Sequence, residues 1–369
     1  MSDKTKFTSG QDAGTGNIIC WDDSSLNSNS WKEMQILMNK SVQAGSLFSK
    51  DAVSTYALLG TASTLACGGV LAPNGDIYFI PSGRSGTKMS AAGVLSTYSL
   101  VYTLSSGATF GGVLASNGDI HFIPRSAAVG QKVSAYAVVS TYALVYTTTD
   151  SYCGGVLAPN GDIHMVPLNA IVGQKVSSSG VVSTYSLVYT VATAYGGGVL
   201  APNGDIHFIP SSAAIGQKIS AAGVVSTYAL VYTKATGYSG GVLAPNGDIH
   251  FVPCGASVGQ KISASGVVST YSLVYTGVIA YLGGVLAPNG DIHFVPYSAP
   301  VGQKISSTGT VSTYSLVETG TIAYQGGVLT PNGDIHFIPY NSIGGQKVST
   351  FSANPFSLAM CQSPFFNKF

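Results

Sequence analysis

Residues 197–210 read GGVLAPNGDIHFIP, and close copies of this stretch recur along most of the 369-residue chain. The tetrad Asn-Gly-Asp-Ile within it appears seven times, at a constant interval of 43 residues. A fixed period of this length is the signature of a repeat architecture, so the usual expectation of two or three unrelated domains does not apply. The aspartates of the seven tetrads are Asp76, Asp119, Asp162, Asp205, Asp248, Asp291 and Asp334.

Each unit reads as four short β-strands. Gly-Gly-Val-Leu-Ala is the first strand, and the Asn-Gly pair after it favours a two-residue hairpin turn of type I′. Asp-Ile-His-Phe-Ile is the second strand, and it stops at a proline, which cannot donate to a β-ladder. The third strand is GQKIS at 216–220, and the fourth is VSTYALVYT at 225–233, rich in β-forming residues. We expect the first strand to lie innermost, because glycine permits close backbone approach.

Four strands in about 43 residues is the size of one propeller blade, and seven blades suit a closed ring. A trefoil would need three units, and an open solenoid would need polar caps. The sequence therefore predicts an all-β fold, a seven-bladed β-propeller over residues 51–361. The aromatic strand occurs eight times if a degenerate last copy is counted, so one terminus must complete a blade begun at the other. We expect residues 52–60 to be this clasp, rather than residues 351–360.

The two ends of the chain lie outside the repeat. We expect residues 1–50 to be an anchoring arm, and residues 362–369 to be a short C-terminal tail. Residues 30–33 read SWKE, a capping-box pattern, and the apolar residues behind it fall on one helical stripe. A short helix near 31–42 is therefore expected. The arm would dock on a partner through Trp21, Trp31, Met34, Leu37 and Met38.

The composition excludes several classes of protein. Only 8% of the residues are charged and the formal net charge is +1, which argues against nucleic-acid binders and basic membrane-surface proteins, since both need a cationic face. We find no run of about 18 apolar residues and no secretory signal pattern, and so expect no membrane span and no secretion. The five cysteines, at positions 20, 67, 153, 254 and 361, have neither metal-site nor disulfide spacing and read as small buried hydrophobes.

Three kinds of polar residue each keep one position in the repeat. Every turn aspartate is matched by a lysine, and all six histidines share one position, with Tyr78 in the seventh place. We interpret them as structural rings that satisfy buried polar atoms, because sevenfold symmetry sets equivalent side chains too far apart to share a metal. The lysines are Lys88, Lys132, Lys175, Lys218, Lys261, Lys304 and Lys347, and the histidines are His121, His164, His207, His250, His293 and His336.

The sequence offers no catalytic constellation. Identical carboxylates in every unit lack the asymmetry of a glycosidase pair, and neither a nucleophile elbow nor a phosphate-binding loop is found. We therefore expect no enzymatic activity, no cofactor and no metal. The loops before the Gly-Gly strand and after the second-strand proline do vary between units, and recognition usually resides in such loops. The first set comprises 103–110, 147–153, 190–196, 233–239, 276–282 and 319–325.

The units VLAPNGDIHFIP and VSTYSLVYT resemble propeller repeats of predicted virion proteins from marine tailed bacteriophages, over residues 51–361. They differ from WD40 and kelch repeats, since no Trp-Asp pair ends a unit. The resemblance implies a structural or host-recognition role, as a capsid-decoration or fibre-type protein on the virion surface. Such a protein would be made in the host cytoplasm without a signal peptide. It would be held by residues 1–50 on another virion protein of the capsid, vertex or tail, and would be placed to contact the host surface.

A glycan-binding lectin is the alternative function. Equivalent weak sites between the blades would gain from avidity, and aromatic residues near the rim could stack on sugars. The candidate tyrosines end the fourth-strand motif and are Tyr102, Tyr146, Tyr189, Tyr232 and Tyr275.

Overall fold

The structure is a computed structural model that describes residues 51–58, 66–83, 85–103, 105, 107–342 and 344–350. The predicted helix near 31–42, the arm side chains and the C-terminal tail lie outside these residues. The chain divides into two compact units, and the larger comprises 53–331 and 335–347. The smaller comprises 1–52, 332–334 and 348–369. Within it, Ser349 Oγ donates to Asp334 Oδ1 at 2.6 Å.

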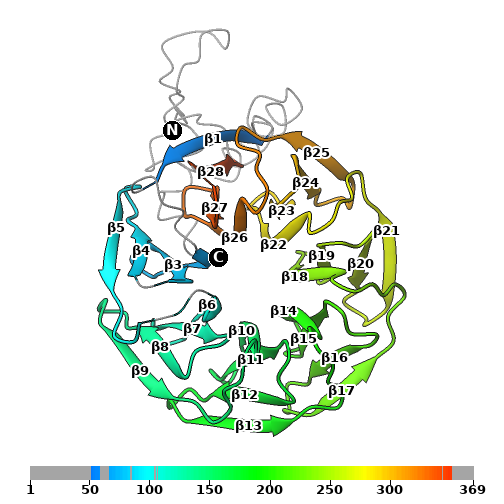
Figure 1. Ribbon diagram of the computed structural model, residues 1–369. Helices are drawn as coiled ribbons and strands as arrows, with labels where there is room; N and C mark the ends of the chain where they lie inside the picture. The colour runs from blue at the N-terminus through cyan, green and yellow to red at the C-terminus, as the bar shows by residue number, and fades with distance from the viewer. Residues whose placement is uncertain are drawn as a thin grey trace, which may run out of the picture. The chain divides into compact units, whose positions relative to one another are not determined.

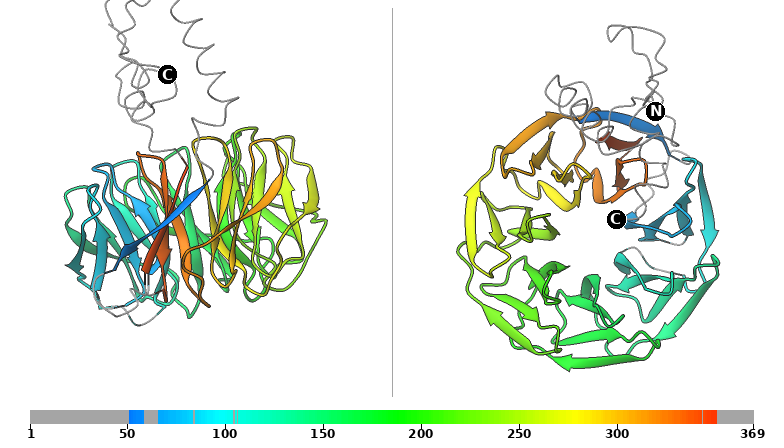
Figure 2. Two further views of the ribbon diagram at one scale, coloured as in Figure 1. Left: turned by 90° about the horizontal axis from the view of Figure 1, so that it is seen from above. Right: turned by 180° about the vertical axis from the view of Figure 1, so that it is seen from behind.

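The larger unit is a ring of seven four-stranded antiparallel sheets, which confirms the predicted propeller (Figure 1). In six blades the strands hydrogen-bond in chain order from the axis to the rim, and in the last blade the N-terminal strand is the outer one. Figure 2 shows the ring from its edge and from behind. Among the residues described, no helix is long and apolar enough to cross a membrane.

The strand bounds repeat from blade to blade. The first three blades are β2 (Ala66–Leu71), β3 (Ile77–Pro81), β4 (Ser85–Met89), β5 (Leu95–Ser99); β6 (Thr109–Leu114), β7 (Ile120–Pro124), β8 (Val129–Val133), β9 (Val139–Ala143); and β10 (Tyr152–Leu157), β11 (Ile163–Pro167), β12 (Val172–Val176), β13 (Val182–Ser186). The next three are β14 (Tyr195–Leu200), β15 (Ile206–Pro210), β16 (Gly216–Ile219), β17 (Val225–Tyr228); β18 (Tyr238–Leu243), β19 (Ile249–Pro253), β20 (Val258–Ile262), β21 (Val268–Ser272); and β22 (Tyr281–Leu286), β23 (Ile292–Pro296), β24 (Val301–Ile305), β25 (Val311–Ser315). The last blade is β26 (Tyr324–Leu329), β27 (Asp334–Pro339), β28 (Gly344–Ser349) and β1 (Ala52–Ala57).

The first strand of each blade lines the axis, as predicted (Figure 1). One glycine in it forms a β-bulge with positive φ, which is +85° at Gly240. A Cβ on Gly197 would come within 2.8 Å of the Cα of Gly240 in the next blade. Glycine is therefore required where seven backbones meet around the axis. The glycines at this position are Gly68, Gly111, Gly154, Gly197, Gly240, Gly283 and Gly326.

The turn after the first strand is not the predicted type I′ turn. Gly75 N donates to Ala72 O, and Ala72 N donates to Asp76 O, which closes a three-residue loop. In this loop only Gly75 has a positive φ, of +85°. The geometry is that of a type I turn followed by a glycine bulge. The corners are Pro73 and Asn74, one residue earlier than the predicted Asn-Gly corners, which leaves Gly75 at the bulge. The second blade, where Ser116 replaces the proline, forms the same loop, since Gly118 N donates to Ala115 O at 3.0 Å.

The N-terminal strand closes the ring, as predicted. Strand β1 is the outer strand of the last blade and pairs with β28, in the sheet order β1-β28-β27-β26. The Tyr56 ring covers Gly345, where any Cβ would collide with it, and the Tyr56 hydroxyl donates to Phe337 O at 3.4 Å. Closure removes the exposed sheet edge that an incomplete last blade would present.

The second strands are buried at every residue, as in Ile206–Pro210, and they pack against the first strand of the next blade. Phe208 and Ile209 are fully buried although neighbouring side chains of a strand point to opposite faces. A Cβ on Gly198 would meet Val156 and Val166 of the preceding blade. Both faces of each sheet are therefore covered, which explains why apolar residues of the second strand occur on both faces instead of alternating with polar ones.

The ring has two chemically different faces. The turn face carries the Asn-Gly-Asp turns and the hairpins between third and fourth strands, such as 220–224. The loop face carries the connections between second and third strands, such as 211–215, and those that lead to the next blade, such as 229–237. Strand β1 begins, and strand β28 ends, on the turn side of its blade.

Candidate functional site

The turn aspartates and the lysines pair within the blades and hold the turn face together. Lys218 Nζ lies 2.7 Å from Asp205 Oδ2, and Asp205 Oδ1 accepts a hydrogen bond from Ala221 N at 3.2 Å. Burial raises the pKa of Asp205, but these hydrogen bonds prevail and hold that pKa below its usual value. The equivalent pairs are Lys88–Asp76, Lys132–Asp119, Lys175–Asp162, Lys261–Asp248 and Lys304–Asp291.

The histidines are buried in the second strands, next to these ion pairs. His164 Nδ1 lies 3.3 Å from the Tyr185 hydroxyl, with ring centroids 5.5 Å apart. Burial, and then the charge of Lys175, lower the pKa of His164 to about 4. Burial also lowers the pKa of three equivalent residues to about 4, so all four are neutral at pH 7. The three are His121, His207 and His250.

The tyrosines predicted as glycan contacts lie on the loop face, and most are half-buried. Tyr102 is the most open, with 38% of its surface exposed. Tyr146 packs edge-on against Tyr152, with ring centroids 6.3 Å apart, and its backbone N–H donates to Gln174 Oε1 at 2.8 Å. Because Gln174 belongs to the next blade, these tyrosines join neighbouring blades. Their contact with glycans stays a prediction.

The symmetry of the ring breaks around the axis on the loop face. A Cβ on Gly196 would lie 3.5 Å from Ser211 Cβ in the same blade and 3.1 Å from Ser239 Cα in the next, so two repeat positions meet there. One is the residue after the second-strand proline, and the other is the second residue of the first strand. We call these positions the axial mouth; they hold Ser82, Arg125, Leu168, Ser211, Cys254, Tyr297 and Tyr340, and Cys67, Phe110, Cys153, Gly196, Ser239, Leu282 and Gln325.

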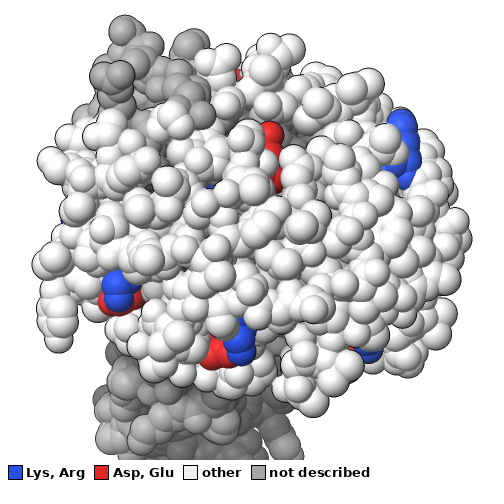
Figure 3. All heavy atoms as spheres, turned by 60° about the horizontal axis from the view of Figure 1, so that its bottom comes forward, with Lys and Arg blue, Asp and Glu red and all other residues white. Residues whose placement is uncertain are grey.

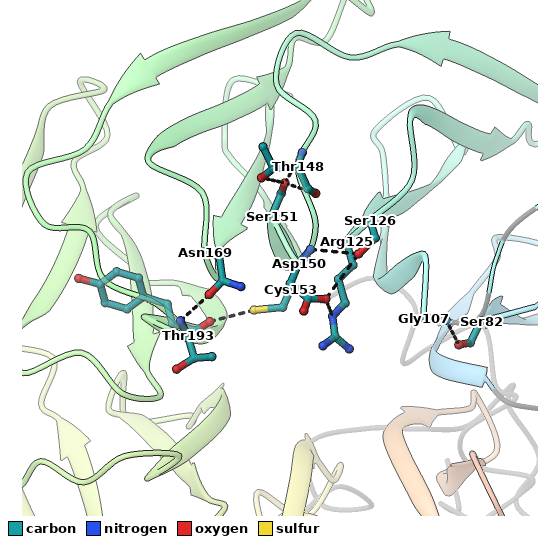
Figure 4. A network of polar contacts seen from close by, with 11 residues as sticks. Ser82, Gly107, Arg125, Ser126, Thr148, Asp150, Ser151, Cys153, Asn169 and Thr193 are labelled. Carbon is teal, nitrogen blue, oxygen red and sulfur yellow. Dashed lines mark hydrogen bonds and ion pairs between the residues drawn. The ribbon is translucent and has the colours of Figure 1, made fainter.

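Arg125 is the only arginine within the described ranges, and it lies in the axial mouth. Its Nε is 2.6 Å from Asp150 Oδ1, and its Cζ is 5.6 Å from the centroid of the Phe110 ring. Asp150 N donates to Ser126 Oγ at 3.0 Å, which fixes the loop that carries the carboxylate. Figure 4 shows the guanidinium pointing from the second blade toward the axis. Its two Nη atoms have no partner among the residues that the structure describes.

The last two blades supply aromatic residues to the same mouth. Tyr297 and Tyr340 are half-buried, with ring centroids 6.4 Å apart. Burial raises the pKa of both hydroxyls, and the positive charge of Arg125 opposes that rise. Gln325 is 6% exposed, and its Nε2 has no hydrogen-bond partner within the described part of the chain.

The remaining side of the axial mouth carries small residues. Gly196, Ser211 and Ser239 stand where other blades have Phe110, Arg125 or a tyrosine. The mouth is therefore a single asymmetric arrangement, with cationic and aromatic groups on one side and small residues on the other. Three cysteines of the ring are free and buried, as predicted; they are Cys67, Cys153 and Cys254.

A second, smaller asymmetry lies on the turn face between the second and third blades. Ser116 replaces the proline found in the other six units. A cavity of about 120 Å³ opens there, lined by Ser116, Ser178, Lys132 and His121 among others. Such a cavity holds a few water molecules, and we assign it no function.

Sequence analysis identified the loops of the axial mouth as variable but did not single out Arg125, Tyr297 or Tyr340. A comparison of the seven units could have pointed to these residues. The proline before each of these residues is constant in all seven units, while the next residue changes in size and charge. What the sequence lacked was any sign that these positions converge on one point.

The chain matches no protein-family model and no curated protein. Its fold is similar to that of a streptogramin B lyase, with a TM-score of 0.71 at 18% identity, over 82% of this chain and 98% of the lyase chain. Virginiamycin B lyase from Staphylococcus aureus gives 0.71 at 16% identity, over 81% and 99%. The WD40 propeller domain of Doa1 gives 0.64 at 13% identity, over 83% and 99%. At these identities the likeness shows the fold alone.

Proposed function

We propose that this chain is a non-enzymatic virion surface protein, a rigid propeller that displays one recognition site at its axial mouth. The observation that supports this best is the contrast between uniform blades and a varied loop face. The blades repeat nearly the same buried network, while residue size and charge change most in the loops of the axial mouth. A constant scaffold with one varied face suits recognition rather than chemistry repeated in each blade.

The titratable groups favour a role without catalysis. All six histidines occupy the second strands, and the four with a lowered pKa are neutral and engaged in the cores of the blades. The carboxylates of the turn face are neutralised by lysines in the same blade. The lyases of similar fold share too little sequence with this chain to carry their activity over to it.

The direction of the strands supports an outward loop face. Residues 1–50 are joined to the start of β1, on the turn side of the ring. A partner that holds this segment leaves the loop face, with its axial mouth, free to contact another surface. Figure 3 shows a surface with few charged atoms, some of them positive and negative groups side by side.

A mass-spectrometric inventory of purified particles tests the proposal. We expect this chain in the particles at a fixed ratio to the major shell protein. Deletion of residues 1–48 should leave a folded ring, with unchanged β-sheet circular dichroism, that no longer joins particles. Absence of the full-length chain from particles would refute the virion role, and normal incorporation of the truncated chain would refute the anchor.

A lectin with equivalent sites between blades remains the alternative. It is favoured by Tyr102, Tyr146, Tyr189, Tyr232 and Tyr275, which recur around the loop face and keep part of their rings accessible. Stoichiometry separates the two ideas, since a rim lectin would bind several sugars per chain and the axial mouth only one. A titration with a neutral oligosaccharide that gave several equal sites, weakened by Tyr102→Ala, would favour the lectin.

A further inference from the structure

Arg125 is one of two cations that the structure describes on the loop face, and it is the one that offers a planar guanidinium. Six turn-face lysines are held at 2.6 to 2.8 Å from aspartates of their own blades. Lys234, the other loop-face cation, donates to the backbone carbonyl of Gly255 at 2.5 Å. Asp150 takes only the Nε side of Arg125, and both charged side chains stay about a third exposed.

The free edge of the guanidinium has the geometry of an anion receptor. Two Nη groups in one plane can donate in parallel to both oxygens of a carboxylate, a contact that lysine cannot reproduce. The Phe110 ring lies beside the guanidinium, with its centroid 5.6 Å from Arg125 Cζ. Tyr297 and Tyr340 belong to the same mouth and carry hydroxyl donors, and Gln325 offers a buried N–H with no partner among the described residues.

The rest of the axial mouth suits the ring of a sugar. The half-buried rings of Tyr297 and Tyr340 provide an apolar surface with polar tips, as sugar-stacking residues do. On the other side, Ser211 and Ser239 leave room and can hydrogen-bond to hydroxyl groups. No second arginine within the described residues repeats the arrangement, so one chain has one such site.

We propose that the axial mouth binds one acidic saccharide, with its carboxylate on the Nη edge of Arg125 and its ring against Tyr297 and Tyr340. This inference rests on the proposed recognition function and names its ligand class. Asp150 is then a competitor, which occupies Nε and lowers the attraction of the guanidinium for an incoming anion.

Titration calorimetry on the full chain tests the site with three probes: methyl glucuronide, methyl glucoside and inorganic phosphate. We expect one glucuronide per chain, and at least tenfold weaker binding of the glucoside. Phosphate separates a site for any anion from one for a saccharide. If phosphate binds as well as the glucuronide, or the glucoside binds equally, the acidic-saccharide assignment is wrong.

Substitutions test the role of each charge. Arg125→Gln should weaken glucuronide binding roughly ten- to a hundredfold, the range of a hydrogen bond to a charged group, and Arg125→Lys should weaken it less. Asp150→Asn should strengthen binding severalfold, because it removes the competing charge. Asparagine tolerates the positive φ of 55° at this residue, so the loop should persist. Lys234→Gln is the matched control, a lost cation on the same face, and should leave binding unchanged.

The outcomes distinguish this inference from the virion role. Unaltered glucuronide binding by Arg125→Gln, or no glucuronide binding by the wild-type chain, overturns the ligand assignment even if particles contain the protein. Particles that lack the protein, while the purified chain still binds glucuronide through Arg125, overturn only the virion role. Particles carrying Arg125→Gln should contain the normal amount of protein but adsorb less to cells that display acidic polysaccharide.

Discussion

The buried histidines predict that mild acid destabilises the ring, between pH 7 and pH 5. Four of them have a pKa of about 4 in the folded chain, against 6.5 in an unfolded one. Because the folded pKa is lowered, the unfolded chain binds protons first as the pH falls. The contribution of these histidines to the free energy of unfolding is therefore fully present above pH 6.5 and is lost as the pH falls toward 4.

The magnitude follows from the two pKa values. Between pH 7 and pH 5, protonation linked to each such histidine lowers the free energy of unfolding by about 2 kcal/mol, and the four together lower it by about 7 kcal/mol. That is of the order of the whole stability of an ordinary domain. The lowered pKa values of the turn aspartates do not contribute in this window, because they act below the ordinary carboxyl value of about 3.8.

Chemical denaturation followed by far-ultraviolet circular dichroism, at pH 7 and pH 5 and constant salt, measures this loss. His207→Tyr is the matched variant, because Tyr78 already fills that position in the first blade, 4% exposed and with its ring centroid 5.5 Å from that of Tyr98. The variant should lose about 2 kcal/mol less than the wild type between the two pH values. Equal losses in both proteins would refute the assignment of acid sensitivity to the buried imidazoles.

Three further predictions concern packing and closure. Gly283→Ala should lower the free energy of unfolding by at least about 1 kcal/mol more than Gly180→Ala, as measured by chemical denaturation. Both glycines have φ of 86°, but only at Gly283 would a Cβ lie 3.2 Å from a neighbouring Cα. Equal losses would contradict a crowded axis. Gln260→Leu removes the acceptor of two backbone N–H groups of the preceding blade, those of Val231 and Tyr232. It should lower the free energy of unfolding by about 1–3 kcal/mol for each N–H left without an acceptor, measured in the same way. An unchanged stability would show that these hydrogen bonds are dispensable. Tyr56→Ala should loosen strand β1, so that limited proteolysis cuts within residues 51–58 first; an unchanged cleavage pattern would contradict closure by this strand.

Local chemistry made most of the fold predictable. The period of 43 residues, the proline stops and the turn glycines set four strands to a unit, and the eight aromatic copies against seven turns indicated how the ring closes. The predicted type of the first turn was wrong because the corners fall one residue earlier, at Pro73 and Asn74, so that glycine occupies the bulge position. The second blade shows the same loop with Ser116 in place of the proline, so the proline alone does not decide it.

The candidate site was predictable only in part. Sequence comparison of the units located variation in the loops and matched each turn aspartate with a lysine, and six of these matches are ion pairs within a blade. The half-buried state of Tyr146 and its equivalents could not be decided from the sequence, because it depends on the glutamine of the next blade and on packing between blades.

The amino-acid sequence by itself determined the blade, the number of blades and the residues that stay constant, since these depend on neighbours in the chain. Only the tertiary structure decided that Arg125, Tyr297 and Tyr340 belong to one mouth around the axis, although up to 215 positions separate them. The physical reason is geometric. Closure of the ring turns equal positions in seven units into neighbours around one axis, so that differences spread along the sequence become a single asymmetric surface.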